Sequence, residues 1–323
     1  MNNQTDVNFE QILEAALSIK GHAHNTPVLT NGAADALTQA QLYFKCENLQ
    51  RTGSFKFRGA LHALTNLKRR SLESVDVVTF SSGNHGHALA AAAKLLGCRA
   101  TVVMPSDAPK FKIEATRAWG ANVHLYDREQ EDRERLAQHY VDQQGMTLIP
   151  PFDYADVIAG QGTAAVELFE EVGPLDVLFV PVGGGGLIGG IALATHHLSP
   201  SCRVIGVEPL GSNHAQISLR TGVRTRLDGP HTIADGARAS QMGKLNFALM
   251  QRYVDDIETV DDDALRRQMR FLLEQMKIWV EPTGCLAAAA AMHQRSDLRG
   301  KRVGVLLSGG NIDFSAAVPM MHP

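Results

Sequence analysis

The amino-acid sequence predicts an α/β protein in which mostly parallel sheets are flanked by helices. Short apolar runs alternate with longer amphipathic ones, and glycine-rich or polar turns follow several of the apolar runs. The chain has 323 residues, more than a single hydrophobic core usually holds, so two lobes are expected. No Pro/Ser-rich linker separates them. We therefore expect a small lobe at 71–150, inserted into a large ligand-binding lobe formed by 1–70 and 151–323.

The individual elements follow from apolar spacing. An opening helix is expected over 9–20, where apolar side chains recur at helical spacing. The apolar runs that predict strands are 42–46, 75–80, 100–104, 122–125, 176–182, 203–208 and 302–307. The amphipathic runs that predict helices include 85–96, 109–119, 128–143 and 187–197.

Three turns that follow predicted strands carry glycine and polar residues. They lie at 81–84, 183–186 and 308–311. In open α/β sheets, ligands bind where the chain leaves the carboxyl ends of the strands. The three turns are therefore expected to form one shared site.

Composition and charge exclude several classes of protein. With 20% charged residues and a formal net charge of −3, the chain has no electrostatic footprint for nucleic acid or a membrane surface. The four cysteines form no CxxC pair, which predicts free and mostly buried thiols. No run reaches the ~20 apolar residues of a membrane span, and the first residues do not resemble a signal peptide. A cytoplasmic location is expected.

A lysine is the first candidate for chemistry. Lys56 lies in the run SFKFRGA, beside a glycine-containing turn and between Phe55 and Phe57. Such surroundings can remove water from the amine, lower its pKa and make it a nucleophile. A lone lysine is more often a surface charge, so the whole run is more informative than Lys56 by itself.

Two further turns could bind anions. The run SSGNHG at 81–86 precedes a predicted helix, whose first N–H groups could bind a carboxylate; the alternative is a helix cap by Ser82 or Asn84. The four glycines at 183–186 enter another helix and could hold a phosphate. That stretch also matches GxGxxG with Glu208 after the next strand, so a dinucleotide-dependent oxidoreductase is an alternative.

Taken in order, these runs resemble the fold-type II enzymes that use pyridoxal 5′-phosphate (PLP). The match extends from about residue 25 to 315 and includes AGQGT, IADG and EPTG. AGQGT points to the branch of threonine/serine dehydratases and serine racemases. The resemblance implies a two-lobed fold like that of the tryptophan synthase β subunit.

The resemblance also implies a role for each site residue. Lys56 would bond covalently to PLP, and Ser82 would be a catalytic residue on the opposite face. The coenzyme would further be held by Phe55, Asn84, Gly183, Gly184, Gly185, Gly186, Gly236 and Ser308. The substrate would contact Ser81, Ser82, Asn84 and His85.

The implied activity is loss of water from a β-hydroxy amino acid, giving a 2-oxo acid and ammonia. Threonine and serine are the default substrates, with 3-hydroxyaspartate and phenylserine as alternatives and amino-acid racemisation as another. Pro150–Phe152 replaces a more polar segment of relatives, which favours a larger or aromatic side chain. The chain ends soon after the 308–311 turn, which suggests a degradative role without a regulatory domain. A homodimer is expected by analogy.

A divalent cation is a further implication of the resemblance. Related chains often hold one with the acid of a VEP segment and an aspartate six residues later. Here Glu208 is present but the later residue is His214, and an imidazole suits magnesium or calcium poorly. A cation held by Glu208 and the carbonyl of Ser212 stays an alternative. The histidine pairs of the chain lack metal-ligand spacing and are expected on the surface or in turns.

Overall fold

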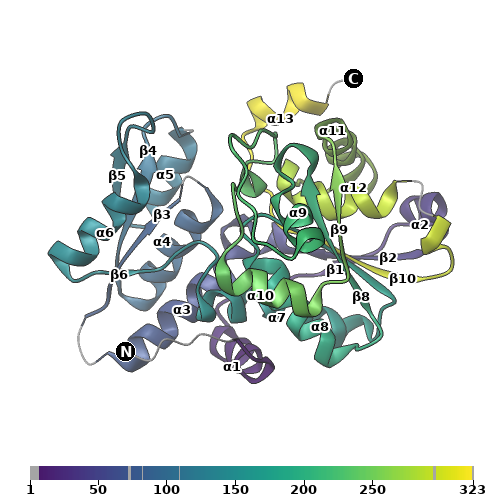
Figure 1. The fold of residues 1–323 in the computed structure, drawn as a ribbon, viewed down its shortest axis with the longest axis horizontal. Helices are drawn as coiled ribbons and strands as arrows, with labels where there is room; N and C mark the ends of the chain where they lie inside the picture. Colours follow the sequence, from purple (N-terminus) through teal and green to yellow (C-terminus); the bar gives the residue numbers. More distant parts are fainter. Residues whose placement is uncertain (1–6, 72–73, 82, 109, 294–295, 322–323) are drawn as a thin grey trace.

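The structure is a computed structural model that describes residues 7–71, 74–81, 83–108, 110–293 and 296–321. Its elements form two α/β lobes that lie side by side (Figure 1). The strands are β1 (Val28–Leu29), β2 (Gln41–Cys46), β3 (Asp76–Phe80), β4 (Arg99–Pro105), β5 (Asn122–Tyr126), β6 (Thr147–Leu148), β7 (Val177–Pro181), β8 (Arg203–Pro209), β9 (Asp256–Val260) and β10 (Arg302–Leu307). The α-helices are α1 (Phe9–Ile19), α2 (Gly32–Thr38), α3 (Lys56–Arg70), α4 (Asn84–Leu96), α5 (Lys110–Ala118), α6 (Arg133–Gln144), α7 (Ala155–Val172), α8 (Gly186–Leu198), α9 (His214–Thr221), α10 (Lys244–Tyr253), α11 (Asp262–Phe271), α12 (Leu286–Met292) and α13 (Phe314–Met321).

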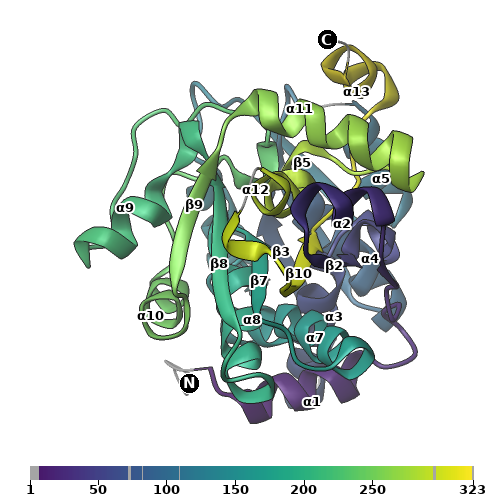
Figure 2. The same cartoon turned by 90° about the vertical axis from the view of Figure 1, so that its right-hand side faces the viewer.

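The larger sheet has the strand order β1-β2-β10-β7-β8-β9. All neighbouring strands in it are parallel except β1, which pairs antiparallel with β2. Helices α1, α7, α8 and α10 cover one face, and α2, α11 and α12 cover the other (Figure 2). Alternate side chains of β7 enter the two cores: Leu178 and Val180 face the first, and Val177 and Phe179 face the second.

The smaller sheet has the order β5-β4-β3-β6 and is parallel throughout. Its apolar residues pack with α3, α4 and α5 in one cluster and with α6 in another. All of its strands come from residues 76–148, whereas both ends of the chain build the larger sheet. The exact lobe boundaries of 1–70 and 151–323 against 71–150 stay a prediction.

The predicted α/β fold is confirmed, and the predicted strands lie within one or two residues of the observed ones. The predicted start of the helix at 128–143 was wrong. The helix begins at Arg133, because the Asp132 side chain accepts the N–H groups of Glu134 and Arg135 and caps the helix there. Helix α7 was not assigned from the sequence. It is buried along most of its length and therefore lacks a polar face to mark its period.

The cysteines are free, as expected: Cys46, Cys202 and Cys285 are buried and Cys98 is half-buried. Among the described residues, no helix combines the length and apolar character that crossing a bilayer requires.

Candidate active site

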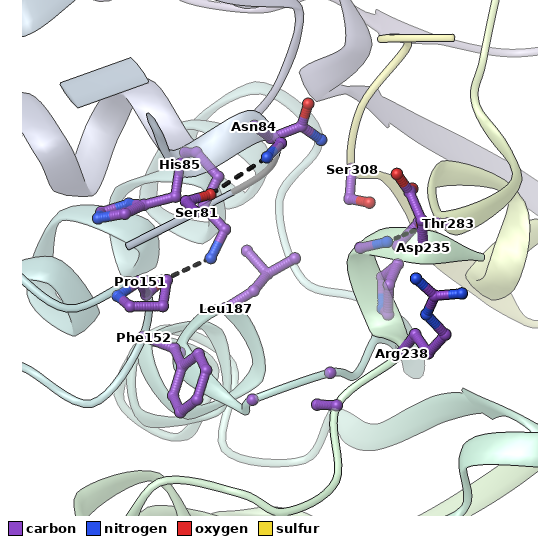
Figure 3. Close-up of a pocket in the computed structure, with 18 of the residues that line it drawn as sticks. Ser81, Asn84, His85, Pro151, Phe152, Leu187, Asp235, Arg238, Thr283 and Ser308 are labelled. Carbon is purple, nitrogen blue, oxygen red and sulfur yellow. Dashed lines mark hydrogen bonds between the residues drawn. The ribbon is translucent and has the colours of Figure 1, made fainter. Parts of the chain in front are cut away.

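The three predicted turns meet at one pocket between the lobes (Figure 3). The turn after β3 supplies Ser81, Asn84 and His85, the turn after β7 supplies Gly183–Gly186, and the turn after β10 supplies Ser308. The prediction of a shared site is confirmed, because the carboxyl ends of these parallel strands open on the same space. Ser82 lies outside the described residues.

Lys56 is the first residue of α3, and its side chain reaches this pocket. The turn before it contains Thr52 and Gly53, both with positive φ (65° and 72°), and the Asn311 amide donates to the Thr52 carbonyl. The Lys56 Nζ donates to the Pro151 carbonyl at 2.6 Å and lies 5.1 Å from the centre of the Phe55 ring. Burial lowers the pKa of Lys56 to about 8, which confirms the expectation from the SFKFRGA run.

The glycine turn before α8 has no room for side chains. A Cβ on Gly184 would lie 2.2 Å from the Phe152 ring, one on Gly183 would lie 2.9 Å from the Gly236 carbonyl, and Gly185 has a φ of 94°. The first N–H groups of α8 therefore meet the pocket without intervening side chains. A helix start of this kind is suited to a phosphate.

The start of α4 joins the two lobes. The Asn84 amide donates to Glu281 Oε1 at 2.6 Å, and its oxygen accepts from the Asn311 amide at 2.8 Å. Burial, together with nearby Asp235, raises the pKa of Glu281 to about 8. Both polar ends of Asn84 are thus engaged with protein groups, and its contact with the coenzyme stays a prediction.

His85 was expected on the surface or in a turn, and that expectation was wrong. It is 2% exposed, and its ring Nε2 lies 3.1 Å from the Ile149 carbonyl, to which it donates in the tautomer that this contact requires. Burial and the nearby Lys56 lower the pKa of His85 to about 3. The ring on the pocket wall is therefore neutral.

The far wall comes from a 3₁₀ turn at Asp235–Ala237. The Gly236 N–H donates to Thr283 Oγ1 at 3.0 Å. Asp235 pairs with Lys112 of α5 at 2.7 Å, a contact that crosses from one lobe to the other. Ser308 is 2% exposed, and its carbonyl accepts the Phe55 N–H at 3.1 Å.

Sequence reasoning missed three cations of the lining: Lys112, Arg133 at the start of α6, and Arg238. Lys112 and Arg133 belong to the smaller lobe and have no local signal, because only the meeting of the lobes brings them to the pocket. Arg238 could have been found, because it lies two residues after Gly236 of the IADG run.

Glu208 lies apart from the pocket lining, at the end of β8. Both of its carboxylate oxygens accept backbone N–H groups at the start of α9, from Ala215 at 3.0 Å and Gln216 at 2.8 Å. In a dinucleotide-dependent enzyme, this acidic residue would have to be free to bind the ribose of the dinucleotide. The structure does not support that alternative.

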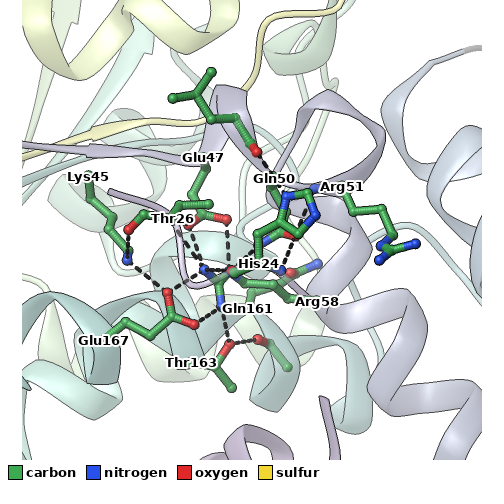
Figure 4. A network of polar contacts seen from close by, with 12 residues as sticks. His24, Thr26, Lys45, Glu47, Gln50, Arg51, Arg58, Gln161, Thr163 and Glu167 are labelled. Atoms are coloured by element: carbon green, nitrogen blue, oxygen red, sulfur yellow. Dashed lines mark hydrogen bonds and ion pairs between the residues drawn. The ribbon is translucent and has the colours of Figure 1, made fainter. Parts of the chain in front are cut away.

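A buried ion network fixes the start of α3 (Figure 4). The Arg58 guanidinium pairs with Glu47 at 2.7 Å and with Glu167 of α7 at 2.6 Å, and Lys45 also pairs with Glu167 at 2.7 Å. Burial by itself would raise the pKa of Glu47, but Arg58 and Lys45 lower it below its usual value. Because Arg58 follows Lys56 by two residues, this network holds the lysine's helix against the larger lobe.

An amine of lowered pKa beside a glycine-lined helix start suits a small molecule that carries both a carbonyl group and a phosphate. The amine can bond to the carbonyl while the backbone N–H groups bind the phosphate. A two-lobed α/β protein with this pocket fits the class of enzymes that use a phosphorylated aldehyde coenzyme.

The chain belongs to the family of pyridoxal-phosphate dependent enzymes, which matches residues 19–309. It is 51% identical to an L-threo-3-hydroxyaspartate ammonia-lyase of Pseudomonas sp., with 95% of this chain and 96% of the relative covered. It is 49% identical to a serine racemase of Schizosaccharomyces pombe, covering 95% and 94%. The solved structure of maize serine racemase has a TM-score of 0.92 at 38% identity and covers 98% of this chain and 97% of the maize chain.

The protein is therefore a fold-type II PLP enzyme of the ammonia-lyase and racemase group. The sequence-based predictions of the family, fold class and coenzyme are confirmed. The cytoplasmic location and the homodimer stay predictions.

Proposed function

We propose that the enzyme is an ammonia-lyase that acts on a β-hydroxy amino acid with a second carboxylate, of the 3-hydroxyaspartate type. The substrate loses water across its α and β carbons, and the enamine that results tautomerises, takes up water and releases ammonia. The products are a 2-oxo acid and ammonia.

The roles of the site residues belong to this proposal. Lys56 would carry PLP, with Gly183–Gly186 at its phosphate, Phe55 and Gly236 on its two faces and Ser308 at its ring nitrogen. When bound, PLP withdraws electrons from the substrate's α carbon and so acidifies the α proton. The Lys56 amine then removes that proton at Nζ, and the N–H groups around Ser81–His85 hold the α-carboxylate. A catalytic role for Ser82 stays part of the proposal.

The observation that best supports a substrate with a second carboxylate is the presence of cationic side chains in the pocket. Besides Lys56, its lining holds Lys112, Arg133 and Arg238. Lys112 is paired with Asp235, but neither arginine has a carboxylate partner among the described residues; Arg133 lies 5.3 Å from the centre of the Phe80 ring. Backbone N–H groups are available for the phosphate and the α-carboxylate. The two arginines are therefore available for another anionic group.

We choose Arg238 for the test, because Arg133 already lies over the Phe80 ring. Arg238 lies across the pocket from His85 and Pro151 (Figure 3). The expectation of a larger or aromatic substrate has no independent support from Pro150–Phe152. Pro151 accepts the Lys56 hydrogen bond, and the Phe152 ring lies against the glycine turn at Gly184.

A panel of hydroxy amino acids tests the substrate. We expect kcat/KM for release of 2-oxo acid to be at least about tenfold higher for 3-hydroxyaspartate than for threonine, serine or phenylserine, because a charge-assisted hydrogen bond contributes about 1.5–3 kcal/mol. Arg238→Met should lower kcat/KM for 3-hydroxyaspartate by about 10- to 100-fold and for threonine by less than about threefold. Arg238→Lys, which keeps the charge, should retain most of the preference.

Two outcomes would contradict the proposal. An equal loss for both substrates in Arg238→Met would show that Arg238 does not recognise a side-chain carboxylate. If serine lost optical rotation faster than any panel member released oxo acid, the enzyme would be a racemase.

The lowered pKa of Lys56 predicts a pH dependence of coenzyme capture. The neutral amine is the nucleophile, and it forms as pH rises through about 8, well below the ~10.4 of an ordinary lysine. The rate of PLP attachment to apoprotein, followed by visible absorbance, should therefore rise with pH and level off above about 8. A lysine peptide with the same coenzyme is the control. A rate that kept rising to pH 10 would contradict the assignment.

A further inference from the structure

The end of β8 is the place where the family resemblance implies a divalent cation, and its residues do not suit one. Glu208 is fully buried, and each of its oxygens already accepts an N–H from the first turn of α9. The carboxylate thus serves to cap α9.

His214 occupies the position of the missing aspartate. It is fully buried, and its Nε2 lies 3.5 Å from Glu208 Oε1. Neither ring nitrogen has a hydrogen-bond partner among the described residues. The imidazole ring therefore occupies the space beside the Glu208 carboxylate in which a second oxygen ligand would be needed. Magnesium and calcium favour oxygen ligands and bind poorly to imidazole.

The same short segment supports the wall of the active-site pocket. The Ser212 hydroxyl is fully buried and lies 3.0 Å from the carbonyls of both Ala237 and Ala239, so it can donate to either. Gly211 has no room for a side chain, because a Cβ there would lie 2.0 Å from the His231 carbonyl. The 235–239 segment, which lines the pocket, is thus held by direct protein contacts.

We propose that His214 makes this enzyme independent of divalent cations. The N–H groups at the start of α9 satisfy the Glu208 carboxylate, and the imidazole fills the space in which an acidic residue at position 214 would help to hold a cation. Pocket residues 235–239 then keep their position through Ser212 without a metal. The residue at position 214 thus decides whether this site can bind a divalent cation.

The test is thermal unfolding of the PLP-loaded enzyme after dialysis against EDTA. Adding Mg²⁺, Ca²⁺, Mn²⁺ or Zn²⁺ at millimolar concentration should change the Tm of the wild type by less than about 1 °C. His214→Asp restores an oxygen ligand opposite Glu208, and Mg²⁺ or Ca²⁺ should raise its Tm by about 5 °C or more. His214→Asn, which removes the ring without adding a carboxylate, should show no such response.

Metal analysis of the purified wild-type enzyme gives a second measurement that needs no variant. We expect far less than one divalent ion per chain. A saturable cation-induced rise of the wild-type Tm, with manganese or zinc included, or one bound ion per chain, would overturn the proposal. So would a His214→Asp variant that folds and shows no response to cations.

Discussion

Replacing Lys56 with alanine is expected to abolish covalent attachment of PLP and to lower kcat by at least about 10³-fold. The substitution removes both the amine that bonds the coenzyme and the base that takes the α proton, and a positioned base alone contributes about 10²- to 10⁴-fold. Mass spectrometry after borohydride reduction should find a coenzyme adduct at Lys56 in the wild type and none in the variant. Oxo-acid release measures the loss of activity.

Two controls separate this role from a loss of folding. Lys20→Ala changes an exposed lysine outside the pocket and should retain the adduct and the activity. The melting temperature of apo Lys56→Ala should stay close to that of the apo wild type, because removing an amine whose pKa is depressed by burial does not leave a buried charge without its partner. Full activity in the variant would refute the chemistry proposed for the site.

Replacing Arg58 with methionine is expected to have the largest effect on stability. Its guanidinium makes paired hydrogen bonds with Glu47 at 2.7 and 2.8 Å and with Glu167 at 2.6 and 2.7 Å, and it is completely buried. Methionine would leave Glu47 without this cation in a site that water does not reach. Breaking a buried ion pair in this way costs about 3–5 kcal/mol.

Arg270 provides the matched control for this experiment. It pairs with Glu274 at 2.8 Å, one helical turn away, with both side chains about half exposed. Because exposed pairs of this spacing contribute only about 0.3–0.5 kcal/mol, Arg270→Met should barely change the denaturant midpoint. Adding Glu47→Gln to Arg58→Met should recover part of the loss. Equal small effects of the two arginine substitutions would show that the buried network adds no more than a surface pair.

Local sequence pattern was sufficient for much of the fold. The period of the apolar residues located the strands, and the turns after β3, β7 and β10 were recognisable because glycine and small polar residues have few alternatives at such positions. The family resemblance of the lysine run and the glycine turn also indicated the coenzyme, since each of these motifs lies within a few consecutive residues.

The sequence by itself thus determined the fold class, the family and the turns that meet at the pocket. Only the tertiary structure decided the electrostatics: the position of Arg133 and Lys112 in the pocket and the burial and ion pairs of Arg58. The physical reason is the distance along the sequence over which each feature is determined. Strands and turns depend on neighbouring residues, whereas a side chain's charge and partners depend on groups more than a hundred residues away, such as Glu167 for Arg58 and Asp235 for Lys112.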